Sequence, residues 1–431
     1  MFEKIKLVLS KFIPEFIMAE SINKKKKEMV PSNYKTPKSI LILIIVLILF
    51  LFQEILFRVI FPIPEVTNFN RINYSPVFFG TNPSELKYLS NASFIWASDP
   101  DGVESLINLN LYGFRGNNFC IEPDPDKPRI AFMGDSFVEG YLAKEDETII
   151  SNFGKEVKLH GKNYELVNLG IGGSDFSTYC VLICDMVPVL KPDHVILILH
   201  GNDLPPPPYN PEWLEKPLIP EYTHWWVPRL YYVLKNTIQG KTVPHRWISK
   251  PFTFFAPVPA PSNPWSNTEI SSRYEKFIAP KIANAIRKGR FNPYAVDEYA
   301  QFKEHLPEVF KITRHLNGIE NFMAQYGKKI YIAYIPSRNQ VSPYYLKYEK
   351  EFSTDTSLVP LTDSIYNIHA KIMEASCNSL GIPFYDCTEI IRNEENSGNH
   401  LYWNYDEHMR PKGYALIGKA LYEWWSKAKN M

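Results

Sequence analysis

The sequence predicts an α/β protein with a central parallel sheet of about five strands, covered by helices on both faces. From Arg129 onward, short apolar runs alternate with longer stretches of helical periodicity. The apolar runs are Ile130–Met133, Leu166–Leu169, His194–Leu199, Lys329–Tyr334 and Ile382–Tyr385. Helices are predicted between several of them, notably over Gln301–Tyr326 and Ser364–Leu380. Parallel sheets of this kind bind ligands at the carboxyl ends of their strands.

The composition excludes some classes of protein and of site. A formal net charge of +1 over 431 residues gives no indication of a nucleic-acid partner. Five cysteines without a Cys-x-x-Cys pair argue against a zinc site and against a disulfide framework. Cys377 and Cys387 flank a predicted turn between helix and strand, so a bridge between them stays open.

One segment near the N-terminus is predicted to cross a membrane. Ile40–Phe52 is thirteen apolar residues without a break, and Ser39–Phe61 is long enough to span a bilayer. The segment lacks the amphipathic stripe of a buried core helix, and no cleavage site of the Ala-x-Ala type follows it. Residues 1–38 carry nine lysines and four glutamates, a local charge of +5. Positive flanks remain in the cytoplasm, so the C-terminal part is predicted to lie outside.

Residues 205–270 interrupt the alternation of strands and helices. They contain fourteen of the 35 prolines and five of the nine tryptophans. We therefore predict an insertion over residues 205–300. Its aromatic residues either line a groove for a sugar or acyl chain or form a private core of the insertion.

A serine follows the first predicted strand, in Gly134-Asp135-Ser136-Phe137. At that place the N-terminus of the next helix would point its N–H groups at the serine, which favours a developing negative charge. Ser136 is therefore the candidate nucleophile. The short motif alone is weak evidence.

Two further strand ends carry candidate hydrogen-bond donors for an oxyanion. Gly173 ends the run Asn168–Gly173, where a glycine lets a backbone N–H approach a substrate oxygen closely. Asn202 lies in Gly201-Asn202-Asp203 after the very apolar third strand, and its amide can donate to an oxyanion. Each motif alone is equally typical of a plain turn.

The candidate general base lies near the C-terminus. His408 follows Asp406 by two residues, just before a final amphipathic helix. A carboxylate in that place fixes the tautomer of the imidazole and stabilises the imidazolium that forms. A lone Asp-x-His is more often a solvated loop, so the weight comes from four motifs in a fixed order.

With these motifs the chain resembles the SGNH (GDSL-like) hydrolase superfamily, whose four blocks centre on Ser, Gly, Asn and His. These blocks correspond here to Ser136, Gly173, Asn202 and His408. Other stretches resemble bacterial members: Asn108–Gly116, Gly140–Thr148, Ile335–Arg338 and Phe384–Asp386. An α/β-hydrolase would require Gly-x-Ser-x-Gly, which is absent around Ser136. The Asp-x-His spacing departs from the Asp-x-x-His of many relatives, which makes the role of Asp406 less firm than that of His408.

The resemblance implies a flavodoxin-like three-layer α/β/α fold and a chemistry that needs no metal or cofactor. It implies a serine esterase that acts on acyl esters, O-acetyl groups above all, of cell-envelope carbohydrate through an acyl-Ser136 intermediate. The alternatives are an O-acyltransferase to a surface glycan and a non-catalytic glycan-binding or assembly module. His200, before Gly201, is interpreted as a satisfied core histidine, with a supporting role beside the site as the alternative.

The predicted organisation has four parts. A cytoplasmic segment covers residues 1–38, a transmembrane helix 39–61, a lead-in 62–107, and the hydrolase domain with its insertion 108–431. The chain would be a single-pass protein of the inner membrane with its catalytic domain in the periplasm. Its partners would be the membrane and an ester substrate.

Overall fold

The computed structural model describes two units of the chain, Met1–Ile60 and Phe61–Met431. Within them, the described residues are 38–60, 93–110, 112–203, 208–211, 214, 228–231, 234, 277–304, 309–355, 357–363, 365–366 and 368–430. The tryptophans of the predicted insertion lie outside these ranges.

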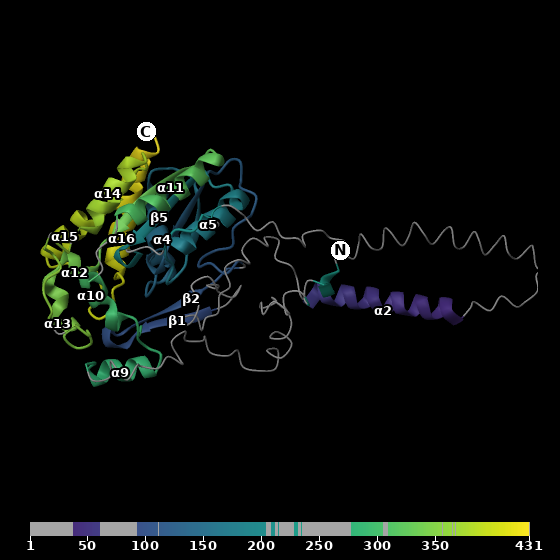
Figure 1. Ribbon diagram of the computed structural model, residues 1–431, viewed down its shortest axis with the longest axis horizontal. Coiled ribbons are helices and arrows are strands. Elements are labelled where there is room, and N and C mark those ends of the chain that lie inside the picture. Colours follow the sequence, from purple (N-terminus) through teal and green to yellow (C-terminus); the bar gives the residue numbers. More distant parts are fainter. Residues whose placement is uncertain are drawn as a thin grey trace, which may run out of the picture. The chain divides into compact units, whose positions relative to one another are not determined.

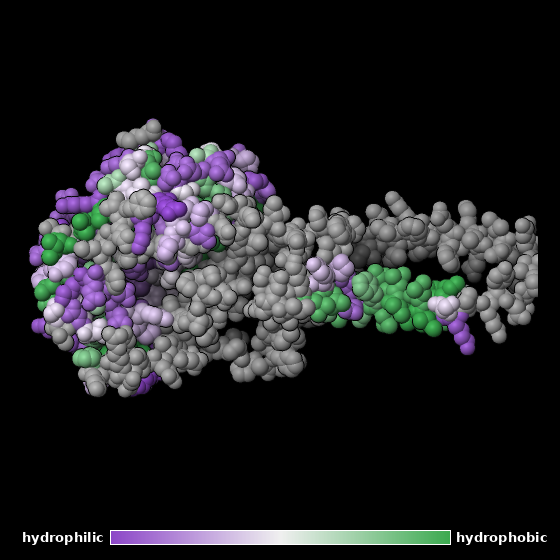
Figure 2. Space-filling model, in the orientation of Figure 1, coloured by the Kyte–Doolittle hydropathy of each residue, from purple (hydrophilic) through white to green (hydrophobic). Residues whose placement is uncertain are grey.

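The first unit contains helix α2, Lys38–Ile60, which is 23 residues long. Such a helix measures ~34 Å, more than the ~30 Å hydrocarbon core of a bilayer. Its apolar side chains are exposed on all sides, and Figure 2 shows them as a continuous hydrophobic band. Glu54 and Arg58 form an ion pair of 2.6 Å near its end. The predicted helix is therefore present and is long and apolar enough to cross a membrane, while its orientation stays a prediction.

The second unit is built on a parallel sheet of five strands in the order β4-β3-β5-β6-β7. Figure 1 shows strand β5 of this sheet among the surrounding helices. The strands are β3 Arg129–Gly134, β4 Glu165–Gly170, β5 His194–His200, β6 Lys329–Ile335 and β7 Phe384–Asp386. Renumbered from the first strand of the sheet, this is the flavodoxin-like order 2-1-3-4-5. The predicted fold class and the positions of all five strands are confirmed.

Successive side chains of each strand enter two different apolar clusters. Met133 and Leu169 pack into one cluster, and Phe132 and Ile198 pack into the other. Helices α5 Phe176–Leu190, α11 Val309–Gln325 and α14 His369–Ser379 cover the first face. Helices α4 Ile149–Leu159, α15 Thr388–Asn396 and α16 Pro411–Ala428 cover the second. The sheet is thus buried on both faces, which explains why its strands are apolar runs and not alternating patterns.

Several elements differ from the predicted bounds. The segment predicted as one helix over Gln301–Tyr326 overlaps two helices, α10 Ala295–Glu304 and α11 Val309–Gln325, and residues 305–308 between them lie outside the described ranges. Strand β7 begins at Phe384, because Pro383 has no N–H to donate to the sheet. Helix α14 begins five residues later than predicted, at His369. Cys377 and Cys387 are both free, buried thiols.

An antiparallel hairpin lies inside the predicted lead-in. Strands β1 Ser93–Ser98 and β2 Val103–Asn108 pair along their full length. Their inner face packs Phe94, Trp96 and Ile107 against side chains that follow the first sheet strand. The remaining short elements are η3 Asp99–Asp101, α3 Ser136–Glu139, η4 Glu145–Glu147, η5 Gly201–Asp203, α9 Pro280–Arg287, α12 Arg338–Val341, η6 Pro343–Tyr345 and α13 Leu346–Glu349.

Candidate active site

Three adjacent strands deliver the candidate nucleophile and the candidate oxyanion donors to one edge of the sheet. Strand β3 lies between β4 and β5, with Gly134 aligned with Gly170 and with Ile198. Ser136, Gly173 and Asn202 each follow the end of one of these strands within three residues. They therefore share the carboxyl edge, with the serine on the central strand of the three.

The structure brings Ser136, His408 and Asp406 together, although the serine and the histidine are 272 residues apart. The Oγ of Ser136 lies 2.6 Å from Nε2 of His408. On the other side of the ring, Nδ1 lies 2.6 Å from Oδ1 of Asp406. Because a carboxylate only accepts, Nδ1 carries the proton and Nε2 is left to accept the proton of the serine. This is the geometry of a nucleophile, its base and the group that orients the base.

The imidazole is held by packing as well as by hydrogen bonds. Asp406 is fully buried, and its Oδ1 also accepts the backbone N–H of His408 at 2.9 Å. The rings of Phe137 and Tyr141 lie 4.9 and 4.2 Å from the His408 ring. His408 is 7% exposed and Ser136 9% exposed, so both remain accessible at one edge. A ring packed in this way keeps its aim on Ser136 before a substrate arrives.

The candidate oxyanion donors lie at the surface of the same edge. Gly173 has a φ of 73°, a conformation that favours glycine, and both it and Asn202 are exposed. Within the part of the chain that the structure describes, neither the Gly173 N–H nor the Asn202 side-chain amide is engaged in a hydrogen bond. Both groups are therefore available to a ligand. Their part in an oxyanion hole stays a prediction.

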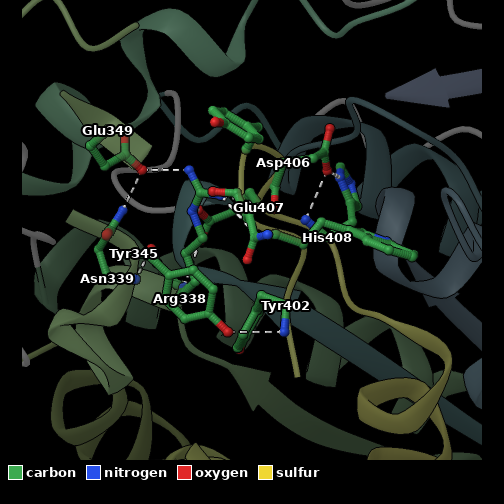
Figure 3. Close-up of polar contacts among 12 residues, drawn as sticks. Arg338, Asn339, Tyr345, Glu349, Tyr402, Asp406, Glu407 and His408 are labelled. Carbon is green, nitrogen blue, oxygen red and sulfur yellow. Dashed lines mark hydrogen bonds and ion pairs between the residues drawn. The ribbon is translucent and has the colours of Figure 1, made fainter. Parts of the chain in front are cut away.

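A buried ion cluster fixes the base loop, residues 403–408 (Figure 3). Arg338, 1% exposed, donates to the carbonyls of Trp403, Asn404 and Asp406 at 3.0, 2.7 and 3.2 Å. Its backbone N–H donates to Glu407 at 2.9 Å, and its guanidinium pairs with Glu349. In the sequence, Ile335–Arg338 resembles a stretch of bacterial relatives but indicates no role for Arg338. Its contacts with the base loop show that it supports this loop.

His200 has a defined place beside the site. It is 1% exposed, and Phe137 stacks on its ring at 4.3 Å while also contacting His408. Its Nε2 lies 3.6 Å from Oε1 of Glu407. The contact with the base loop is observed, and a functional role for His200 remains a prediction.

The carboxyl groups of Asp135 and Asp203, which neighbour Ser136 and Asn202 in the sequence, are both buried. Asp203 accepts the hydroxyl of Tyr179 at 2.8 Å and the backbone N–H of His200 at 2.7 Å. Asp135 accepts the backbone N–H of Phe137 at 2.9 Å and caps the short helix α3. Burial raises the pKa of Asp203 well above its usual value, and the nearby charge of Asp135 raises it further. The negative charge of Asp203, the residue after Asn202, is thereby disfavoured.

The chemistry of the site depends on its hydroxyl, imidazole and carboxylate. Among the described residues, no group of three or more His, Cys, Asp or Glu side chains is arranged to hold a metal ion.

Comparisons with known proteins give similarity at the level of fold. No protein-family model matches the chain, and no curated protein matches it. Solved structures with a similar fold include the psychrotrophic esterase EstA from Pseudoalteromonas, at 11% identity and a TM-score of 0.35, covering 71% of this chain and 100% of that one. An acetyl xylan esterase, AlAXEase, has 12% identity and a TM-score of 0.35, with coverage of 69% and 98%.

A GDSL-like lipase from Bacteroides thetaiotaomicron has 11% identity and a TM-score of 0.35, with coverage of 72% and 93%. The predicted similarity in fold to GDSL-like esterases and acylhydrolases is therefore found. At such identities the likeness concerns the fold alone, so the chemistry is inferred from the geometry of the site.

Proposed function

We propose that this chain is a serine esterase that hydrolyses O-acyl esters, O-acetyl groups above all, of cell-envelope carbohydrate. The observation that carries the proposal is the continuous relay from the Ser136 hydroxyl through His408 to Asp406, with both heavy-atom distances at 2.6 Å. Such short contacts at a strand end are expected where a serine is activated as a nucleophile. The fully buried Asp406 is suited to orient the base and to stabilise its charged form.

The proposed reaction has two halves. Nε2 of His408 accepts the Ser136 proton while Oγ attacks the ester carbonyl, and the resulting oxyanion is bound by the N–H groups of Ser136 and Gly173 and by the Asn202 amide. Each such donor is typically worth about 3 kcal/mol in the transition state. His408 then gives its proton to the departing sugar hydroxyl, which leaves acyl-Ser136. A water molecule that gives a proton to His408 attacks the acyl carbon of this ester. The bond from that carbon to Oγ then breaks, the carboxylic acid leaves, and His408 returns the proton to Oγ of Ser136.

The substrate class is proposed from the chain's first unit as well as from the site. Helix α2 is long and apolar enough to hold the protein at a membrane, and the positive charge before it favours an outward domain. A catalytic domain outside the cytoplasm meets envelope glycans first. If a glycan hydroxyl takes the place of water, the same residues transfer the acyl group, so hydrolysis and transfer are separated by experiment.

The first test uses the full chain in detergent micelles. We expect Ser136→Ala to abolish both covalent labelling by a fluorophosphonate probe and turnover of a chromogenic acetate ester, without lowering the thermal unfolding midpoint. The matched control is Ser379→Ala, on helix α14, whose hydroxyl bonds only a carbonyl of its own helix. Labelling of the Ser136 variant at the wild-type rate would exclude Ser136 as the nucleophile.

A second measurement separates the candidate functions. The release of free acetate from a polysaccharide with labelled O-acetyl groups is measured in the presence and absence of a deacetylated acceptor glycan. An esterase releases labelled acetate in both mixtures, whereas a transferase moves the labelled acetyl group to the acceptor. Glycan binding with neither labelling nor turnover would favour a non-catalytic module.

A further inference from the structure

We infer that the hairpin β1–β2 is a brace of the active site, and that Trp96 and Asp101 are positioning residues for the oxyanion turn and for the base loop. The inference rests on the proposed function. The hairpin lies in the segment that the sequence assigned to a lead-in, and it reaches both loops from one two-stranded element.

The first contact runs through a buried carboxylate. Trp96 donates its ring N–H to Oε1 of Glu139 at 3.0 Å, and the other oxygen of Glu139 accepts the backbone N–H of Gly172 at 2.7 Å. Trp96 is 1% exposed and Glu139 is fully buried. A carboxylate removed from water needs such donors, so its position is tightly defined. Because Gly172 immediately precedes Gly173, the hairpin determines where the candidate oxyanion donor lies.

The second contact runs through stacked rings. The ring of Trp96 lies 4.7 Å from that of Tyr141, which in turn lies 4.2 Å from the imidazole of His408. Tyr141 also accepts the hydroxyl of Tyr414 at its carbonyl, which ties it to helix α16. Trp96 thereby supports the wall against which the general base is packed.

The third contact holds the backbone N–H groups of the base loop. Asp101, in the turn of the hairpin, accepts the backbone N–H groups of Asn404 and Tyr405 at 2.8 and 3.1 Å. Arg338 donates to carbonyls of the same loop, so the two side chains bind complementary backbone groups. Ser98 donates to the second oxygen of Asp101 at 2.7 Å and fixes its orientation.

The hairpin is itself held in place by the rest of the unit. Arg290 donates to Asp99 at 2.7 Å and to Glu104 at 2.8 Å, and Ser105 donates to the carbonyl of Ala143. An isolated two-stranded hairpin is at best marginally stable in water. Its order therefore depends on these contacts, and a disturbance of the hairpin is transmitted to the catalytic loops.

The test uses two conservative substitutions in the full chain in detergent micelles. Trp96→Phe retains a ring but removes the donor to Glu139. Asp101→Asn retains the shape but offers the two N–H groups a weaker acceptor. For each, we expect kcat on the chromogenic acetate ester to fall at least about tenfold with KM within about twofold, because transition-state contacts and not ground-state binding are disturbed. The rate of fluorophosphonate labelling should fall in parallel and still reach completion at Ser136.

Matched variants decide between positioning and mere stability. Leu106→Ala changes the outer, 52% exposed face of the same hairpin and should retain wild-type kcat. If Trp96→Phe lowers the unfolding midpoint markedly, Glu139→Gln replaces it, since that variant leaves the packing of Trp96 intact and should show the same kcat loss. Wild-type kcat in Glu139→Gln and Asp101→Asn would overturn the inference. Absence of labelling and turnover in the wild-type chain would instead overturn the proposed function, and this inference with it.

Discussion

The two loops that meet at the Ser136–His408 contact are stabilised in different ways. The base loop, residues 403–408, is held by ionised side chains, with Arg338 between Glu349 and Glu407 and against the loop carbonyls. The nucleophile turn, residues 134–140, is held by close backbone packing. A Cβ at Gly170 would lie 2.6 Å from the carbonyl carbon of Val138. One loop depends on charge balance and the other on the absence of a methyl group.

Buried ionisable groups near the candidate site also differ in their charge state. Burial opposes the positive charge of Arg338, but the carboxylates of Glu349, Glu407 and Glu298 outweigh it and raise the pKa of the guanidinium. At Asp203, by contrast, burial raises the pKa of the carboxyl group, which favours its neutral form. The loop that carries His408 is thus held by buried ion pairs. The buried carboxyl group of Asp203 tends toward its neutral form.

The largest effect is expected where the ion pairs are broken. Arg338→Ala would leave Glu349 and Glu407 buried without their cation, which typically costs about 3–5 kcal/mol. We expect the thermal unfolding midpoint of the full chain in detergent to fall by roughly 5–10 °C. Turnover should also be lost, because three loop carbonyls lose their donor.

The control for this variant is an ion pair of the same kind at the surface. Lys191 pairs with Glu122 at 2.8 Å, but the two side chains are 52% and 77% exposed. Lys191→Ala should change the free energy of unfolding by less than ~1 kcal/mol. Equal midpoints for the Arg338 and Lys191 variants would show that the base loop does not depend on the buried cluster.

A smaller effect is expected at the turn that depends on packing. Gly170→Ala places a methyl group against the backbone of Val138 and Glu139, which cannot rotate away as a side chain would. Such overpacking typically costs about 1–3 kcal/mol. It would also shift the backbone of the turn that carries Ser136. We therefore expect a lower unfolding midpoint together with slower fluorophosphonate labelling.

Gly154→Ala is the matched control, because it adds the same methyl group in helix α4. Its Cβ would lie 3.1 Å from a side-chain methyl of Leu166, which can move. Alanine also favours a helix interior over glycine by about 1 kcal/mol. The two variants should change the midpoint in opposite directions. A stabilising Gly170→Ala would show that the turn is held by something other than close packing.

The sheet could be predicted, and Ser136 and His408 could be singled out as candidates, because their signals are local and recur in a fixed order. Strand β5 is apolar from Val195 to Leu199, since both faces are buried, and Ser136 and Asn202 follow strand ends where side chains of parallel sheets converge. His408 could be singled out because it precedes a clear amphipathic helix and follows Asp406 by two residues.

The supporting contacts could not be predicted, because each joins residues that are distant in sequence and ordinary in type. Trp96 and Glu139 are 43 residues apart, and Arg338 is 66 residues from the carbonyl of Asn404. A buried arginine or glutamate looks like a surface residue until its partners are known. The hairpin was not predicted for a different reason: β2 is not a continuous apolar run, because it carries Glu104 and Asn108 on its outer face.

The smallest effect is expected at Asp203, the buried carboxyl group whose neutral form is favoured by burial. Its folded pKa lies well above the usual 3.8, so the unfolded chain loses this proton first and stability falls as pH rises from 3.8 toward the folded pKa. Asp203→Asn removes that loss. The new amide can accept from the His200 N–H and donate to the Tyr179 hydroxyl, which turns to the Ser174 carbonyl at 3.3 Å. We expect a change within ~1 kcal/mol near pH 4 that favours the variant increasingly as the pH rises above that value, measured by thermal unfolding. The exposed Asp126→Asn is the control for the loss of one charge. A variant destabilised equally at every pH would mean that Asp203 is ionised in the folded chain and that charge, not neutrality, supports the nucleophile.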